Sequence, residues 1–273
     1  MAKTIFITGA SRGFGKIWLE SFLKRGDRVA ATSRNVDGLK YLEDQYPDTF
    51  LSLQLDITDR SSVFAALDRA NEHFGGLDVV INNAGYGVFG MVEEIDEQAA
   101  RSLIETNILG TLWVTQACLP IFRKKGGGHI IQLSSVLGLW SLPSLGVYSA
   151  TKFAVEGLSE ALAKEVSAQG ISVTLVEPNA YATDFGGTSA VVSQPIAAYD
   201  GLRTSLASRG DNKDSYGDPE ATVDAIHKLI DSRNPPLRFF LGKIGLLKTK
   251  AVYGERIEEW EKWNETAIAA HRK

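Results

Sequence analysis

Tyr148 and Lys152 are residue types that together could move a proton. They open a helical pattern that continues through Val155, Leu158 and Leu162. Residues four positions apart lie on one face of a helix, so the phenol and the ammonium group should be neighbours. An adjacent cation favours phenolate and lowers the pKa of a tyrosine from its usual value of about 10. Such a phenol is suited to reducing a carbonyl group or oxidising an alcohol.

A hydroxyl group is expected beside the same substrate oxygen. The apolar run His129–Leu133 predicts a buried strand, and Ser134 and Ser135 follow its carboxyl end. Either serine could supply the hydroxyl, and the interval of thirteen residues to Tyr148 favours Ser135. A Tyr-x3-Lys pair is frequent by chance in a chain with 8 Tyr, so its position behind a strand that ends in serine carries the interpretation.

The elements that must position these residues alternate between strand and helix along the chain. Strands are expected at Lys3–Thr8, Arg28–Ser33, Phe50–Leu55, Leu77–Asn82, His129–Leu133, Ser172–Glu177 and Arg238–Leu241, and helices at Gly13–Arg25, Val36–Tyr46, Ser61–Phe74, Asp96–Glu105, Asn107–Lys124 and from Tyr148 to Val166. Strands separated by single helices need right-handed crossovers. The expected fold class is therefore α/β: a single Rossmann-type, doubly wound domain whose parallel sheet of about seven strands has helices on both faces.

Two segments interrupt this alternation. Residues 1–242 are expected to form the dinucleotide-binding and catalytic domain, and within it residues 179–217 form a substrate lid. The stretch from Pro178 to Gly217 is too long for an idle loop, and it leaves the strand edge where open α/β sheets bind ligands. Residues 243–273 predict a helical tail of the same domain, with Trp260 and Trp263 packed against the body or a neighbouring subunit.

The composition excludes several classes of protein. The net charge of −4 gives no reason to expect nucleic acid as a partner. Cys118 is the single cysteine, which fits a reducing cytoplasm, and the four His are not at ligand spacing, so no metal is expected. A strand begins at Lys3, so we expect no signal peptide. The longest apolar runs are too short to span a membrane.

A glycine-rich loop joins the first expected strand to the first helix. Its sequence is Thr8-Gly-Ala-Ser-Arg-Gly-Phe-Gly15. Glycines permit a tight turn and a close approach of the backbone, so a pyrophosphate can lie against the amino end of the helix. The position after a strand and before a helix makes a dinucleotide site the expected function of this loop.

Taken together, these motifs resemble those of the short-chain dehydrogenase/reductase family. The segments Thr8-Gly-x3-Gly-x-Gly15, Asn82-Asn-Ala-Gly85, Ser135 and Tyr148-x3-Lys152 occur in the order and the approximate spacing of that family. The resemblance covers residues 3 to about 242. It implies hydride transfer between a nicotinamide cofactor and a carbonyl or carbinol carbon.

The choice of cofactor depends on the end of the second expected strand. NAD-binding folds commonly place an acidic residue there to hold the ribose hydroxyls. This strand ends Thr32-Ser33-Arg34-Asn35, without a carboxylate. Arg34 can stack on adenine and pair with a 2′-phosphate, and Arg12 lies nearby in such folds. We therefore expect NADP(H) to be preferred over NAD(H).

The resemblance implies further cofactor contacts. Asp56 and the Ile57 backbone would hold the adenine, whereas Asn82 would be structural. Asn179 stands where the family has glycine, and asparagine tolerates positive φ better than most residues. The residues expected to contact the cofactor are Gly9, Ser11, Arg12, Gly13, Phe14, Gly15, Arg34, Asp56, Ile57, Asn83, Ala84, Gly85, Tyr148, Lys152, Pro178 and Thr183.

The expected catalytic residues are Asn107, Ser135, Tyr148 and Lys152. Tyr148 would donate its proton to the developing alkoxide while Ser135 hydrogen-bonds the same oxygen. By resemblance, Lys152 anchors the nicotinamide ribose, and Asn107 lies in a helix irregularity that holds a water for the proton path.

An apolar pocket is expected on the open side of the site. It would be formed by Leu137, Trp140, Leu142, Tyr181, Phe185 and Val191, and it suggests a medium or large hydrophobic carbonyl compound or alcohol. The competing interpretation is that several of these residues are core or subunit contacts.

Other functions of the same fold remain open at this point. One is a catalytically silent regulator or scaffold that senses NADP(H), and another is an isomerase or lyase. By resemblance, the helices Asn107–Lys124 and 149–168 would pair across a two-fold axis in a homodimer or homotetramer.

Overall fold

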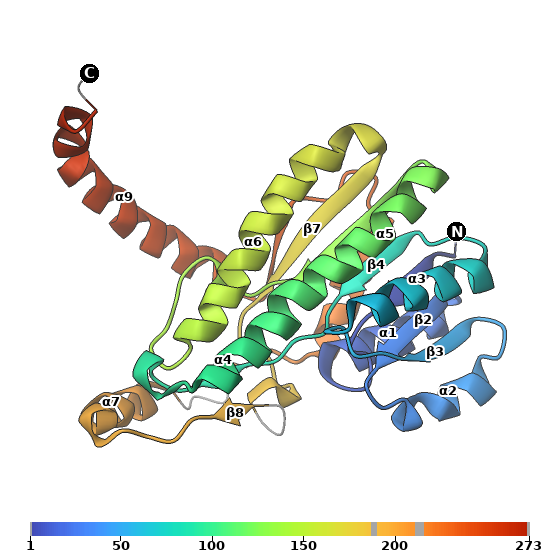
Figure 1. Cartoon of the computed structure of the whole chain (residues 1–273), viewed down its shortest axis with the longest axis horizontal. Coiled ribbons are helices and arrows are strands. Elements are labelled where there is room, and N and C mark those ends of the chain that lie inside the picture. Colours follow the sequence, from blue (N-terminus) through green and yellow to red (C-terminus); the bar gives the residue numbers. More distant parts are fainter. Residues whose placement is uncertain (1, 187–189, 211–215, 272–273) are drawn as a thin grey trace.

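Seven parallel strands form the central sheet of the protein. The computed structural model describes residues 2–186, 190–210 and 216–271. The strands are β1 (Thr4–Ile7), β2 (Arg28–Ser33), β3 (Phe50–Gln54), β4 (Val79–Asn82), β6 (Gly128–Leu133), β7 (Ile171–Pro178) and β9 (Arg238–Leu241), in the order β3-β2-β1-β4-β6-β7-β9. The expected doubly wound α/β fold is confirmed (Figure 1).

Helices cover both faces of this sheet. They are α1 (Gly13–Arg25), α2 (Lys40–Gln45), α3 (Arg60–Phe74), α4 (Glu97–Ile104), α5 (Thr111–Lys125), α6 (Gly146–Val166), α7 (Asp200–Gly210), α8 (Val223–Asp231) and α9 (Gly245–Ala269). One core lies between the sheet and α3, α5 and α6, and the other between the sheet and α1, α2 and α8. Side chains alternate in direction along β1, so Phe6 enters the first core whereas Ile5 and Ile7 enter the second.

The expected lid contains more regular structure than its sequence indicated. We expected an irregular segment, but β8 (Val191–Val192) pairs in parallel with β5 (Val88–Phe89), and α7 follows it. The carboxylate of Glu94 accepts hydrogen bonds from the backbone N–H of Ile196 and from Arg203. The partner strand and this carboxylate lie about a hundred residues upstream, where local patterns cannot show them. Residues 187–189 and 211–215 of the expected lid lie outside the described residues.

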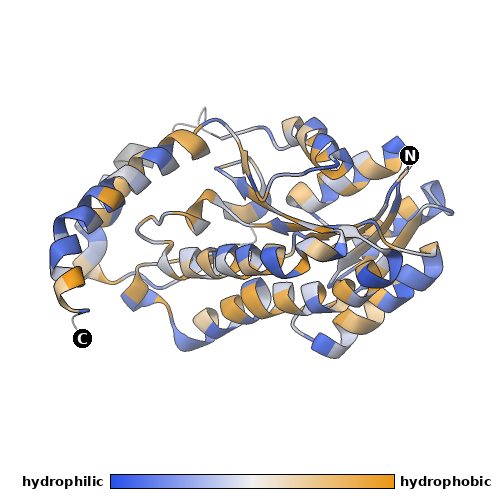
Figure 2. Cartoon of the chain, turned by 90° about the horizontal axis from the view of Figure 1, so that it is seen from above, coloured by the Kyte–Doolittle hydropathy of each residue, from blue (hydrophilic) through white to orange (hydrophobic). Residues whose placement is uncertain are grey.

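The expected C-terminal helix is present as α9, which extends away from the body (Figures 1 and 2). Arg256 Nη1 donates to the carbonyl of Leu139 at 2.8 Å and ties the helix to the loop before α6. Beyond it, the side chains of Trp260 and Trp263 are 62% and 66% exposed, so they do not pack against the body. Residues 272–273 lie outside the description. Within the described ranges, no helix has the length and apolar character needed to cross a bilayer.

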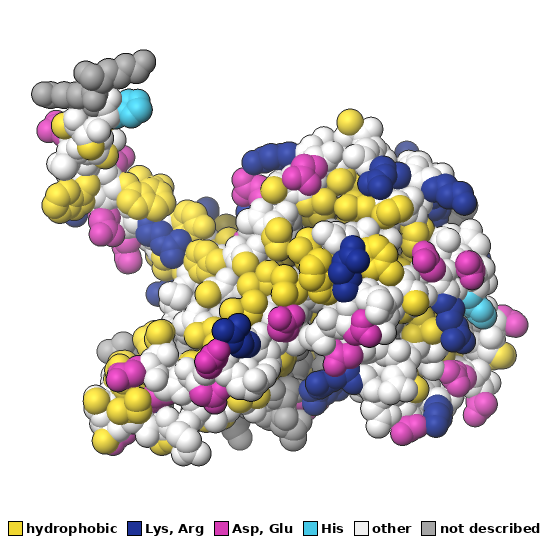
Figure 3. Space-filling view, viewed as in Figure 1, with side chains coloured by type: hydrophobic (Ala, Val, Ile, Leu, Met, Phe, Trp, Pro, Cys, Tyr) yellow, Lys and Arg dark blue, Asp and Glu magenta, His cyan; other side chains and the backbone are white. Residues whose placement is uncertain are grey.

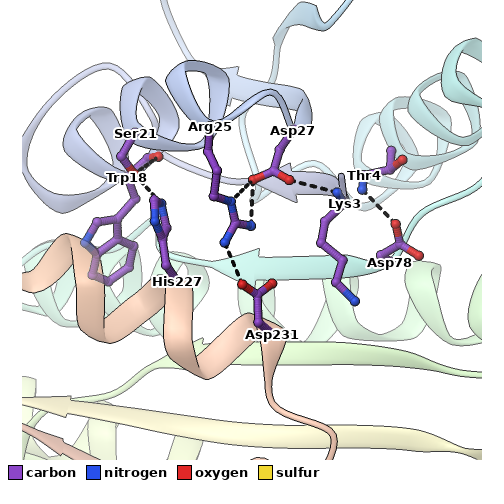
Figure 4. A network of polar contacts seen from close by, with 9 residues as sticks. All are labelled: Lys3, Thr4, Trp18, Ser21, Arg25, Asp27, Asp78, His227 and Asp231. Carbon is purple, nitrogen blue, oxygen red and sulfur yellow. Dashed lines mark hydrogen bonds and ion pairs between the residues drawn. The ribbon is translucent and has the colours of Figure 1, made fainter. Parts of the chain in front are cut away.

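A network of charged side chains joins α1 to α8 at the amino ends of the strands (Figure 4). The buried carboxylate of Asp27 accepts hydrogen bonds from Lys3 N and Arg25 Nε, both at 2.8 Å. Arg25 continues to Asp231 on α8 at 2.9 Å, and Asp78 accepts from Thr4 N at 2.7 Å. These contacts fix the edge of the sheet that is opposite to the carboxyl ends of its strands.

Asp27→Ala should lower the free energy of unfolding by about 3 kcal/mol, because it leaves a partly buried backbone N–H and part of a guanidinium without their buried acceptor. Asp231→Ala is the matched control. Asp231 is half exposed and binds the same guanidinium, so its loss should cost less than about 1 kcal/mol. Urea unfolding measures both, and equal losses would contradict the role assigned to Asp27.

Candidate active site

A cavity of about 1210 Å³ lies at the carboxyl ends of β1 to β4. The chain reverses direction across the sheet between β1 and β4, and open α/β sheets bind ligands at such a point. Of the residues expected to contact the cofactor, twelve line this cavity: Gly9, Ser11, Arg12, Gly13, Phe14, Arg34, Asp56, Ile57, Asn83, Ala84, Gly85 and Thr183. Gly15, Tyr148, Lys152 and Pro178 belong to the same prediction but are not among its lining residues.

The glycine loop is fixed by its contacts with the end of β4. Asn83 Nδ2 donates to the carbonyls of Thr8 and Gly9 at 2.9 and 3.0 Å, and Thr8 Oγ1 accepts from the backbone N–H of Asn83 and Ala84. A Cβ on Gly9 would lie 2.8 Å from Ala84 Cα, and one on Gly15 would overlap the carbonyl of Gly9. These glycines are therefore needed for close packing between the two strand ends.

Gly13 has a different environment, because it faces open space. Its φ is +54°, and a Cβ added there would meet only Thr183, at 3.8 Å. No side chain caps the amino end of α1 at Arg12. A helix amino end with free backbone N–H groups attracts anions, so this cradle fits the pyrophosphate of a dinucleotide.

Two arginines also line the cavity, Arg12 directly before Gly13 and Arg34 directly after β2. Arg12 and Arg34 are exposed, and in the described part of the chain neither forms an ion pair with a carboxylate. Asp56 Oδ1 accepts from Thr58 N at 3.0 Å and Thr58 Oγ1 at 2.8 Å. Two guanidinium groups are thus available to a negatively charged ligand in the cavity.

Tyr148 is buried beside Ser135, behind the cavity. Burial raises the pKa of its phenol above the usual value, and a hydrogen bond with the Ser135 side chain opposes the rise. Lys152 Nζ lies 5.8 Å from the centroid of the Tyr148 ring and donates to the carbonyl of Leu133 at 2.6 Å. The expectation that Lys152 brings the Tyr148 pKa below its usual value is therefore wrong for this structure, because desolvation is the larger effect.

Burial also changes the ammonium group of Lys152. It lowers the pKa of Lys152 to about 8, and the negative charge of Glu156 opposes this change. The Leu133 carbonyl is the acceptor that holds Nζ at the end of β6. Lys152 therefore reaches the end of β6 from α6, one helical turn beyond Tyr148.

Asn107 lies in a π-helix, Glu105–Gly110, between α4 and α5. The helix irregularity implied by the family resemblance is thus present. Asn107 Nδ2 donates to the Tyr86 carbonyl at 3.0 Å and to Thr151 Oγ1 at 3.1 Å, and Oδ1 accepts from Tyr86 N. A Cβ on Gly85 would lie 3.1 Å from Asn107 Oδ1 and 3.9 Å from Lys152 Nζ, so both groups surround Gly85.

The two candidate serines point in different directions. Ser135 Oγ accepts from Leu137 N at 3.1 Å and contacts Tyr148. Ser134 Oγ lies under Gly138, where an added Cβ would be 2.8 Å from it. Ser135 is accordingly the serine that the structure brings to the phenol.

The six expected pocket residues do not form one wall. Phe185 contacts the Tyr148 ring, with centroids 5.0 Å apart, and Val191 lines the cavity. Leu137 and Trp140 are buried in the cluster around Tyr148, whereas Leu142 is exposed. Tyr181 packs against Phe14. Leu137, Trp140 and Tyr181 are therefore core contacts, as the competing interpretation expected for some of the six.

The backbone conformation of Asn179, which follows β7, differs from the one that we expected. Pro178 ends β7 opposite Leu241, and Asn179 N donates to the Leu241 carbonyl at 3.0 Å. Among the described non-glycine residues, Ser144 alone has positive φ, so Asn179 does not use the conformation that we expected it to tolerate. Its side chain instead lies against Gly242, where a Cβ would overlap it.

Sequence reasoning missed several residues of the site. Tyr86 and Thr106 line the cavity, and Tyr86 also exchanges two hydrogen bonds with Asn107. Their signal was present, since Tyr86 follows the Asn82–Gly85 motif and Thr106 precedes Asn107. Further lining residues are Thr32, Ser33, Asn35, Leu55, Thr58, Asp96, Gln98, Ala99, Ser102, Glu105, Leu133 and Asp184.

Comparison with known proteins agrees with this geometry. A family model described as short chain dehydrogenase matches residues 3–190. The oxidoreductase BOA17 of Botryotinia fuckeliana is 36% identical over 275 residues, which cover 99% of this chain and 100% of that protein. A 3-ketodihydrosphingosine reductase of Bacteroides thetaiotaomicron is 36% identical, with 88% of each chain covered. An NADPH-dependent 3-dehydrocapnine reductase of Ornithobacterium rhinotracheale is 31% identical, with 90% of each covered.

Solved structures give the same result. A short-chain dehydrogenase from Streptomyces avermitilis superposes with a TM-score of 0.90 at 34% identity and covers 98% of both chains. ElxO with bound NADP has a TM-score of 0.75 at 28% identity, covering 90% of this chain and 99% of that one. The chain belongs to the short-chain dehydrogenase family of oxidoreductases. Use of a nicotinamide dinucleotide agrees with the cradle described above.

Gly13→Ala should weaken NADPH binding by about tenfold or more, because its Cβ enters the space in which the backbone meets the pyrophosphate. Gly26→Ala is the matched control. Gly26 also has positive φ, +88°, but has nothing within 4 Å of an added Cβ, so both variants carry strain and only one alters the cradle. Calorimetric titration measures the affinities, and equal affinities would contradict the assignment of Gly13.

Proposed function

We propose that the protein transfers a hydride between NADP(H) and a carbonyl or secondary alcohol group of a medium or large hydrophobic substrate. The observation that carries this proposal is the grouping of Ser135, Tyr148, Lys152 and Asn107 behind a cavity that begins at a glycine cradle. The family supports the cofactor and the reaction class. The four residues are those of this chain to which we assign the chemistry.

The bound dinucleotide would supply or accept the hydride at its nicotinamide ring. In reduction, Tyr148 gives its proton to the alkoxide that develops on the substrate oxygen, and Ser135 donates a hydrogen bond to the same oxygen. Lys152 stabilises the resulting phenolate through its positive charge. This charge is lost as the pH rises through about 8, so turnover by reduction should decline above that pH.

Substrate entry requires a movement of Phe185. Its ring contacts the Tyr148 ring, with centroids 5.0 Å apart, and the Phe89 ring, with centroids 5.9 Å apart. Val191 lines the cavity next to these rings. A hydrophobic substrate can replace the contact that Phe185 makes with the phenol. This supports a bulky apolar carbonyl compound as the substrate. Two relatives are reductases whose names state 3-keto or 3-dehydro compounds.

The preference for NADP(H) is supported by Arg12 and Arg34. Both line the cavity, and β2 ends in Ser33 without a carboxylate. A guanidinium group binds a phosphate through two parallel hydrogen bonds. The relative that is named NADPH-dependent and the NADP-bound ElxO agree with this choice.

We also propose a homodimer or homotetramer formed through α5 and α6, in a reducing cytoplasm. Apolar side chains gather over these helices on the face seen in Figure 3, and Phe153 and Leu158 on α6 are about 40% exposed. Val114 and Ala117 on α5 belong to the core instead. The exposed apolar residues therefore need a partner. The free thiol of Cys118 is buried, which fits the reducing compartment.

Tyr148→Phe should reduce turnover by about 100- to 10,000-fold, because the variant lacks the phenol that donates the proton to the alkoxide. NADPH affinity should not change. Oxidation of NADPH with a panel of hydrophobic ketones, followed by its near-ultraviolet absorbance, measures turnover. Full activity of the variant would contradict the role of Tyr148. A wild-type protein that binds NADPH but reduces no member of the panel would favour the silent regulator.

Arg34→Ala should weaken NADPH binding by about 10- to 100-fold and leave NADH binding nearly unchanged, because a charged hydrogen bond to the 2′-phosphate is lost. Arg101→Ala is the control, since Arg101 is exposed on α4 and pairs with Glu97. Fluorescence titration with both dinucleotides gives the comparison. An equal loss for NADPH and NADH would argue against phosphate recognition by Arg34.

A further inference from the structure

Two buried acids lie behind the candidate active site, and the mechanism above does not use them. Glu177 on β7 is 0% exposed and Glu156 on α6 is 5% exposed. Arg238 on β9 is the cation between them. Its Nε lies 3.0 Å from Glu156 Oε2 and 3.7 Å from Glu177 Oε1, and its Nη2 lies 2.9 Å from Glu160 Oε2. Three carboxyl groups therefore share one guanidinium.

If every acid of this cluster were ionised, several carboxylate oxygens would have no hydrogen-bond donor. Within the described residues, both oxygens of Glu177 and Glu156 Oε1 are buried without a donor. An ionised carboxylate only accepts hydrogen bonds, and burying it without donors is costly. Glu156 Oε2 and Glu177 Oε1 both face Arg238 Nε, at 3.0 and 3.7 Å, so the two carboxyl groups are neighbours. One proton on the pair converts two facing acceptors into a donor and an acceptor.

The electrostatics agree with this count. Burial raises the pKa of Glu177 to about 8, the neighbouring charge of Glu156 adds to the rise, and Arg238 opposes it. The other charged groups at the cluster are Glu160, which is bound to Arg238 and to Lys164, and Lys152. Glu177 is thus the acid of the pair that holds the proton.

The pair is connected to the candidate active site through Lys152. Glu156 lies one helical turn after Lys152 on α6, and its negative charge favours the ammonium form of Lys152 against desolvation. Glu156 and the Lys152 backbone also pack together, since a Cβ on Gly138 would lie 2.9 Å from Glu156 Cγ and 3.1 Å from the Lys152 carbonyl.

We propose that Glu156 and Glu177 hold one shared proton, and that the single negative charge left on the pair keeps Lys152 protonated. Both acids are positioning residues that act through Lys152. The effect on catalysis rests on the proposed function, whereas the shared proton and the charge of Lys152 can be measured without it. Because two acids face one guanidinium, removal of either leaves the other free to carry the charge. Single substitutions should therefore be milder than the double one.

The shared proton is tested by thermal unfolding of the full chain between pH 5 and pH 8. Folding raises the Glu177 pKa from its ordinary 4.5 to about 8, so the folded protein holds an extra proton in this interval and loses stability as the pH rises. Glu177→Gln removes this loss. The melting temperature of the variant minus that of the wild type should increase with pH. At pH 8 the variant should melt about 4 °C or more above the wild type.

Glu160→Gln is the matched control, because Glu160 binds the same guanidinium but is partly exposed and has a lowered pKa. Its difference from wild type should stay constant between pH 6 and pH 8. Parallel curves for wild type and Glu177→Gln would overturn the proposal. The wild-type protein alone gives a second measurement, a protonated-carboxyl C=O band in the infrared spectrum at pH 7. Absence of this band would also overturn it.

The charge of Lys152 is tested by an NMR titration of its Nζ resonance, assigned with Lys152→Arg. Glu177→Gln should leave the Lys152 pKa unchanged, Glu156→Gln should lower it slightly, and Glu156→Gln/Glu177→Gln should lower it by about 1 unit. Additive shifts, or none in the double variant, would overturn the link to Lys152. In turnover, the double variant should lose kcat at lower pH than wild type with KM nearly unchanged. If the protein reduced no carbonyl compound, the proposed function would be wrong. The Nζ titration would still decide whether the acid pair controls the charge of Lys152.

Discussion

The candidate site depends on hydrogen bonds from side chains to main-chain carbonyls at the ends of parallel strands. Asn83 bonds to the carbonyls of Thr8 and Gly9, which joins the ends of β1 and β4. Lys152 bonds to Leu133 at the end of β6. Strand ends expose carbonyls that the sheet itself does not satisfy, and each such contact fills one of them. The groups needed for chemistry are thereby placed by the same bonds that complete the sheet.

Burial is the second constraint, and it acts against the charges that the chemistry needs. Desolvation raises the pKa of Tyr148 and lowers that of Lys152. Both changes favour neutral groups, so a proton-transfer site in this position requires nearby charge. The acidic pair at Glu156 and Glu177 would contribute to the local field at Lys152, as would the charge of a dinucleotide bound in the cavity. The protonation of Tyr148 and Lys152 therefore depends on groups outside these two side chains.

The sequence was sufficient for the fold and for the residues that occur in motifs. The alternation of elements gave the seven-stranded parallel sheet, and the glycine loop and Asn83–Gly85 line one cavity. The remaining features arise between distant segments. Tyr181 packs on Phe14, and β8 pairs with β5 about a hundred residues earlier. Local patterns report periodicity and not partners, so the buried pair Glu156 and Glu177 could not be predicted either.

The contact between Asn179 and Gly242 has a consequence for the evolution of the chain. The side chain of Asn179 occupies the space that a Cβ at position 242 would need, and Gly242 has a φ of +114°. A larger residue at position 242 would meet both the backbone strain of this positive φ and the side chain of Asn179, and a smaller residue at position 179 would remove only the steric overlap. The two sites form an epistatic pair, in which the order of mutation decides which intermediates can fold. The residues that position 242 after β9 can accept thereby depend on the side chain that follows β7, although the two positions are more than sixty residues apart.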